Sequence, residues 1–132
     1  MLSEIKEKDG VPTGEIGALC KGREPIATAK ISGRGELCEI NGTVSFFYTP
    51  LGILVAASVW GLERGAYSMS ITADSGRTQK IKTLYDKDGY AWCADVTGRI
   101  SARELTESRI NLHKLGGGGG SVATGCVKKC AR

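Results

Sequence analysis

Histidine is almost absent from this sequence, which contains a single one, His113. Imidazole is the commonest protein ligand for transition metals and the usual general base near neutral pH. A metal centre built from several imidazoles of this chain is therefore excluded. A nucleophilic pair of a cysteine with His113 is not expected either, because no spacing in the sequence places a thiol beside this histidine.

The sequence also lacks a long hydrophobic run. The longest, at 51–62, contains Ser58 and two glycines and is shorter than the roughly 20 residues that a membrane-spanning helix needs. The first ten residues alternate acids with lysines and have no apolar centre, unlike a secretory signal. We therefore expect no membrane span and a cytoplasmic location. The five cysteines, an odd number in such a chain, are expected to be free thiols.

A long block of one charge sign is missing as well. The 18 basic residues are spread among 14 acidic ones and leave a net charge of +4, which is typical of a solvated surface. The local basic cluster is Lys128, Lys129 and Arg132, at the end of the chain. The sequence also shows no set of exposed aromatics for stacking on bases. We therefore do not expect a nucleic-acid partner.

The remaining composition is that of one ordinary globular domain, with 41% hydrophobic and 24% charged residues in 132. Residues 1–24 have no clean period and are expected to form an extension outside the core, with at most one helical turn. From residue 25, short runs rich in β-branched and aromatic residues end at glycine or proline, which predicts strands. We predict eight strands in a domain at 25–127, followed by a basic tail at 128–132; the strands are 26–32, 42–49, 53–62, 66–73, 79–84, 90–96, 109–114 and 121–127.

Turn-forming residues separate these strands. Tight turns are expected at Asn41-Gly42, at Pro50 to Gly52 and at Asp88-Gly89, where glycine and asparagine can adopt positive φ and proline fixes φ. Residues 101–108 favour one turn of helix through a capping box. The five-glycine run that starts at Gly116 and ends at Gly120 is expected to be a mobile connector, because glycine loses the most backbone entropy on ordering.

Alternation predicts which side chains face the core. In the strand at 66–73, Tyr67, Met69 and Ile71 share one face and are expected inside. In the strand at 109–114 the same argument places Ile110 and Leu112 inside and His113 on the outer wall. Trp60 and Trp92 are expected to be core residues or contact anchors for a partner.

The order of short motifs resembles the copper/zinc superoxide dismutase family, in particular its short bacterial members, over residues 26–127. The motifs are INGTVSF at 40–46, GILV at 52–55, VWGL at 59–62, DGYA at 88–91 and INLH at 110–113, followed by the glycine run and ATG at 123–125. The resemblance implies an all-β, eight-stranded Greek-key β-barrel of the sandwich architecture.

The same resemblance implies metal sites that this sequence cannot complete. The family binds copper with four histidines, one of them shared with zinc. Its glycine-phenylalanine-histidine-X-histidine stretch matches 68–72, so Ser70 and Thr72 replace two copper ligands, and His113 is the one ligand that matches. The loop that carries the zinc ligands is reduced to about 74–82 and has no histidine. We therefore expect no copper and no zinc cofactor, and no dismutase activity.

The expected function is a superoxide dismutase-like domain that acts as a non-catalytic binding or structural module. Its partner would be an unidentified protein or a second copy, because family members commonly pair through one face. The alternative is a dismutase or metal-binding protein with an atypical site that uses His113 and thiols. Cys126 and Cys130, with Cys38 and Cys93, could supply such thiolates, although single cysteines in strands usually pack as small hydrophobic residues.

Overall fold

The computed structural model describes residues 6–8, 11–13, 25–33, 39–97, 102–105, 107–116 and 120–129. These residues form short strands and one helical turn, in the order β1 (Lys6–Lys8), β2 (Val11–Thr13), β3 (Ala27–Gly33), β4 (Asn41–Thr49), β5 (Gly52–Trp60), β6 (Ala66–Thr72), β7 (Thr78–Tyr85), β8 (Ala91–Thr97), α2 (Ala102–Leu105), β9 (Arg109–Lys114) and β10 (Ala123–Lys129).

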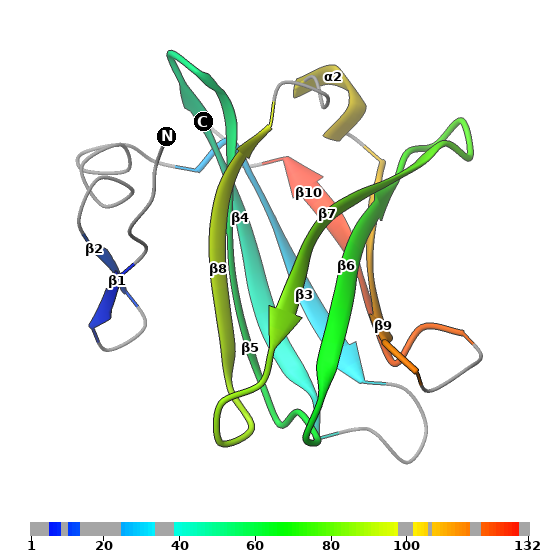
Figure 1. Ribbon diagram of the computed structural model, residues 1–132. Coiled ribbons are helices and arrows are strands. Elements are labelled where there is room, and N and C mark those ends of the chain that lie inside the picture. The colour runs from blue at the N-terminus through cyan, green and yellow to red at the C-terminus, as the bar shows by residue number, and fades with distance from the viewer. Residues whose placement is uncertain are drawn as a thin grey trace.

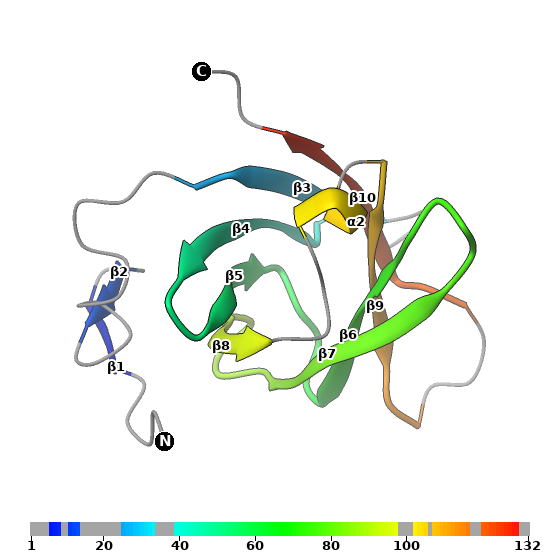
Figure 2. The ribbon, with the colours of Figure 1, turned by 90° about the horizontal axis from the view of Figure 1, so that it is seen from above.

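The strands β3 to β10 form one sheet, which curls into a nearly closed barrel (Figures 1 and 2). The order across the sheet is β7-β6-β9-β10-β3-β4-β5-β8, and every neighbouring pair is antiparallel. The two edge strands approach each other, and Lys82 Nζ of β7 lies 3.6 Å from Asp95 Oδ2 of β8. The strands β1 and β2 pair separately as a small antiparallel sheet.

The structure confirms the all-β class and the eight barrel strands, and it corrects several details. The predicted extension contains β1 and β2 in its described part, where we had expected at most a helical turn. The last strand continues to Lys129, so Lys128 and Lys129 pair with β3 and are part of the sheet. The predicted helical turn is present as α2; Ser101, its expected cap, lies outside the described residues.

One predicted turn is wrong. Asn41 and Gly42 are the first residues of β4 and pair with β5, whereas Asp88 and Gly89 do adopt the positive φ of a turn, at 55° and 83°. A Cβ on Gly42 would lie 2.5 Å from the carbonyl oxygen of Ser58. Glycine is therefore required at position 42 by the close approach of two strands. Most of the five-glycine run lies outside the described residues.

The core fills the inside of the barrel with alternate residues of its strands. The largest buried side chains include Tyr67, Phe46, Leu112 and Leu105. Leu105 belongs to α2, which lies across one end of the barrel in Figure 2, and Ser108 Oγ donates a hydrogen bond to its carbonyl oxygen at 2.8 Å. Within the described ranges, no helix is long and apolar enough to cross a membrane.

Candidate functional site

The residues that match the family's copper ligands lie on the outer wall of the barrel, on β6 and β9. Three alternate residues of β6 are buried in the core: Tyr67, Met69 and Ile71. Ser68, Ser70 and Thr72 therefore point outward. On β9, Ile110 and Leu112 are buried, and His113 is half-buried on the outer face, as predicted.

The register between β6 and β9 decides which of these residues can act together. His113 pairs with Ser68, Asn111 with Ser70, and Arg109 with Thr72. His113 is thus directly opposite Ser68 and diagonal to Ser70, at Cβ distances of about 5 and 7 Å. Thr72 is four residues further along the strand, or about 13 Å.

The outer cluster around His113 therefore consists of Ser68, Ser70 and His113, and Thr72 does not belong to it. Ser68 was missed at the level of sequence, although alternation already places it on the same face as Ser70. The missing information was the pairing register, which alternation leaves undetermined in steps of two residues.

Thr72 instead belongs to a hydrogen-bonded chain across three strands. Asn111 Nδ2 of β9 donates to Thr72 Oγ1 at 3.0 Å, and Thr72 Oγ1 lies 2.8 Å from Thr78 Oγ1 of β7. Ser70, between these residues and His113, is only 7% exposed. The side chains of Asn111, Thr72 and Thr78 thus satisfy one another at one end of this wall.

These side chains do not fit a copper or a zinc ion. Copper and zinc bind imidazole, thiolate or carboxylate groups at about 2 Å, whereas the described residues of β6 opposite and diagonal to His113 carry neutral hydroxyls. Among the described residues, no group of three or more histidine, cysteine, aspartate or glutamate side chains could hold a metal ion. Neither the dismutase chemistry of the family nor its zinc site can be derived from this wall.

The described cysteines lie on opposite sides of the barrel wall. Cys93 of β8 is buried in the core, and this burial raises the pKa of its thiol to about 12. Cys126 of β10 is exposed and pairs with Arg109, about four residues along β9 from His113. Cys93 and Cys126 cannot ligate one ion, and neither reaches His113. Cys38 and Cys130 lie outside the described residues.

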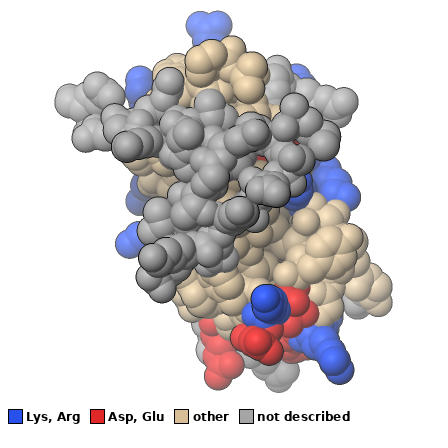
Figure 3. Space-filling view, turned by 60° about the vertical axis from the view of Figure 1, so that its left-hand side comes forward, with Lys and Arg blue, Asp and Glu red and all other residues tan. Residues whose placement is uncertain are grey.

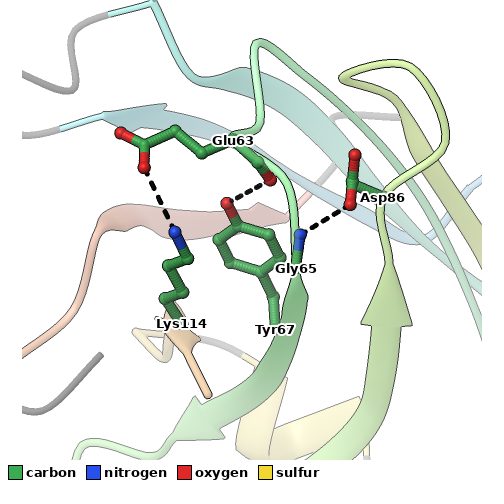
Figure 4. Close-up of polar contacts among 5 residues, drawn as sticks. All are labelled: Glu63, Gly65, Tyr67, Asp86 and Lys114. Atoms are coloured by element: carbon green, nitrogen blue, oxygen red, sulfur yellow. Dashed lines mark hydrogen bonds and ion pairs between the residues drawn. The ribbon is translucent and has the colours of Figure 1, made fainter. Parts of the chain in front are cut away.

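A polar network closes the barrel end where β5 connects to β6 (Figure 4). Tyr67 Oη donates a hydrogen bond to the carbonyl oxygen of Glu63 at 2.8 Å, and Gly65 N donates to Asp86 Oδ1 at 2.7 Å. Burial is the main cause that raises the pKa of Tyr67. A hydrogen bond from Lys114 Nζ to Glu63 Oε2, at 3.1 Å, raises the pKa of Lys114. Each of these groups has a partner, which indicates a structural role.

The two tryptophans lie on the opposite outer wall, formed by β4, β5 and β8. Trp92 packs partly buried against a small outer cluster around Leu54 and Ala94. Trp60 is 44% exposed, and its ring centroid is 5.2 Å from that of Tyr90. Neither tryptophan is a residue of the barrel interior, and the predicted role of a contact anchor for a partner stays a prediction.

In comparisons with known proteins, no family model and no curated protein matches this chain.

Proposed function

We propose that this chain is a barrel of the copper/zinc superoxide dismutase type that has lost its metal centres and acts as a non-catalytic binding or structural module. The observation that carries the proposal is the composition of the outer cluster around His113. On β6, the residues opposite and diagonal to this histidine are Ser68 and Ser70, which carry hydroxyls. A wall with one imidazole and two neutral hydroxyls offers an ion too few donors.

The strand order supports the family resemblance. After β8 the chain passes through α2 and returns to pair β9 with β6, not with β8. In a Greek key, a fourth strand likewise returns to lie next to the first of three consecutive ones, whereas here the second and third of these, β7 and β8, are the two edges of the sheet and do not pair. The return of β9 is thus the kind of connection that the sequence resemblance implies, although fold alone does not determine activity.

The side chains described around His113 argue against dismutase chemistry in particular. Dismutation needs a group that accepts an electron from one superoxide and returns it to another. Serine, threonine, asparagine and a single imidazole do not change oxidation state in this way. What such side chains can do is donate and accept hydrogen bonds, which suits binding.

The test is metal analysis combined with an activity assay. Untagged protein is purified, its copper and zinc contents are measured, and dismutase activity is assayed before and after loading with copper. We expect less than about a tenth of an equivalent of tightly held metal and a rate at background, unchanged in His113→Ala. One equivalent of copper with a rate far above background, lost in His113→Ala, would contradict the proposal and favour the atypical metal site instead.

A further inference from the structure

The outward positions of five neighbouring strands carry no acidic residue. The strands are β7, β6, β9, β10 and β3. Alternation with buried residues, and pairing with outward residues of the neighbouring strand, place four cations on the outside: Lys80, Arg109, Lys128 and Lys30. Around these cations the outward positions hold mainly serine and threonine, together with Asn111, His113 and Cys126. We call the outward residues of these five strands the acid-free wall.

The acidic residues of the described chain lie elsewhere. Asp95 is on β8 and Glu7 on β1, and the others are in α2 or in the connections between barrel strands. Figure 3, which views another side, shows acidic side chains gathered at the lower end, where β5 connects to β6 and β7 to β8 in Figure 1. Basic side chains lie beside the acidic ones at that end, whereas the outward positions of the five strands carry cations without acids, which gives the wall a positive charge.

The four cations are available to a ligand. All four are exposed, and none forms an ion pair with another described residue; the pairs there are Lys82 with Asp95 and Lys114 with Glu63. This leaves their charge uncompensated in the described part of the chain.

The spacing of the cations suits a repeating anion. Arg109 is opposite Cys126, so Lys128 is its diagonal neighbour at about 7 Å. Lys80 is opposite Ser70, which pairs with Asn111. Lys80 is therefore two strand spacings and two residues from Arg109, or about 12 Å. This separation is close to the width of the major groove of a DNA duplex, about 12 Å, whose edges are phosphate backbones.

We propose that the acid-free wall binds the phosphate backbone of a nucleic-acid duplex without recognising its base sequence. This inference rests on the proposed function, because it names the partner of that binding module. Lysine, arginine, serine, threonine and asparagine are the side chains that contact phosphates in protein–DNA complexes.

The shortage of aromatic rings on the wall favours a duplex over a single strand. Proteins that bind single strands stack successive bases on several aromatic side chains. The wall offers one exposed ring, that of Tyr85 at the end of β7. Tyr85 lies five residues along β7 from Lys80, or about 17 Å, so a strand held by the cations would not bring its bases to this ring.

The experiment measures binding of the full chain to a fluorescently labelled DNA duplex of about 20 base pairs by anisotropy, between about 50 and 200 mM KCl with EDTA present. We expect micromolar affinity at the lower salt concentration and a slope of log K against log salt of about −3 to −4, as roughly four phosphate contacts require. The variant Arg109→Gln/Lys128→Gln should bind at least about tenfold more weakly at low salt. Its slope should be smaller in magnitude by about 2, because two phosphate contacts are lost.

The matched control is Arg64→Gln/Lys87→Gln, which removes two exposed cations away from the wall and should bind as the parent does. Circular dichroism checks that each variant is folded. Equal weakening in both variants, or a slope near zero, overturns the inference. Tighter binding of a single strand of the same length, or of polyglutamate, overturns the choice of a duplex. Because EDTA removes metal ions, failure here leaves the copper and dismutase assays to judge the proposed function separately.

Discussion

Glycine at position 125 is required by the contact between β10 and β3. A Cβ at this position would clash with the carbonyl oxygen of Lys30 and would lie 2.8 Å from its carbonyl carbon. Backbone atoms cannot rotate away as a side chain can. We predict that Gly125→Ala lowers the free energy of unfolding by about 1–3 kcal/mol through overpacking, measured by urea denaturation.

The control for this substitution is Gly120→Ala. A Cβ on Gly120 would have no atom within 4 Å, and the residue has no positive φ, so alanine should be neutral or slightly stabilising there. Equal urea denaturation midpoints for Gly125→Ala and Gly120→Ala would show that β10 can move away from β3 to accommodate the methyl group.

Cys93 shows how burial controls a thiol. Its pKa is raised to about 12, first by burial, with Asp95 contributing in the same direction. In a variant with Cys20, Cys38 and Cys130 replaced by serine, we expect Cys126 to react with a thiol reagent in the folded state and Cys93 to react only after unfolding. Rapid reaction of two thiols with the reagent in the folded protein would contradict this placement of Cys93.

The same pKa shift makes stability depend on pH. Because the folded-state pKa of Cys93 lies above the ordinary value of 9.0, the unfolded thiol loses its proton first as pH rises. The contribution of the protonated Cys93 thiol to the free energy of unfolding is complete below about pH 9. It is lost toward about pH 12, by at most ~1.4 kcal/mol per pH unit. Urea denaturation between about pH 8 and 10.5 should therefore show a shallower pH dependence for Cys93→Ala than for the parent. Identical slopes would mean that the thiol is accessible to water.

At the scale of strands, the sequence predicts which side chains face inward and outward, but it does not predict the pairing register between strands. Alternation correctly placed Met69 and Leu112 inside and His113 outside, because a period of two residues is a local property. Which residue stands opposite His113 depends on how β9 pairs with β6, two strands that are far apart in the sequence. Thr72 was predicted as a site residue because it matches a family histidine, and only the register shows that Ser68 lies opposite His113.

Strand ends were also only partly predictable. Asn41-Gly42 has the composition of a turn, but the packing of Gly42 against Ser58 overrides that local preference. In contrast, Asp88-Gly89 does form the predicted turn, and a Cβ on Gly89 would lie at an ordinary contact distance, 3.5 Å, from the carbonyl oxygen of Leu62. These two cases show that a turn-forming pair of residues predicts a turn only where its glycine is not required for the close approach of two strands.

The hydrogen-bonded chain on the outer wall couples three strands. Thr72 accepts from Asn111 of β9 and is bonded to Thr78 of β7. We predict that Thr72→Val and Asn111→Ala each cost about 0.5–1.5 kcal/mol and that the double variant costs less than their sum, as expected for residues that share an interaction. Urea denaturation of the four proteins measures the coupling. Thr43→Val, at an exposed position of β4, provides a control. Additive losses would mean that the hydrogen bond between Asn111 and Thr72 contributes nothing to stability in water.

At the scale of the whole molecule, the barrel sorts side chains that the sequence leaves mixed. Basic and acidic residues are spread among one another along the chain, which argued against a nucleic-acid partner. The strand order brings β3, β9 and β10 together with β6 and β7, and their outward positions contain cations without acids. The opposite wall carries the apolar cluster around Leu54 and Ala94. Two outer surfaces with different chemistry thus arise from strands whose inner faces form one core.

The barrel as a whole also determines where a copper site could be introduced. Imidazoles at Ser68 and Ser70 would both lie within about 7 Å of His113, close enough for three ring nitrogens to meet one ion. We predict that Ser68→His/Ser70→His binds Cu²⁺ at least about tenfold more tightly than Ser70→His/Thr72→His, a difference of ~1.4 kcal/mol. The second variant is the matched control, because it adds the same number of histidines but places one of them about 13 Å from His113.

Calorimetric titration with Cu²⁺, after thermal unfolding has checked that both variants fold, measures the two affinities. His113→Ala in the tighter variant should remove most of the gain, because a third donor is then lost. If the two histidine pairs bind copper equally, the register between β6 and β9 does not control ligand geometry on this wall.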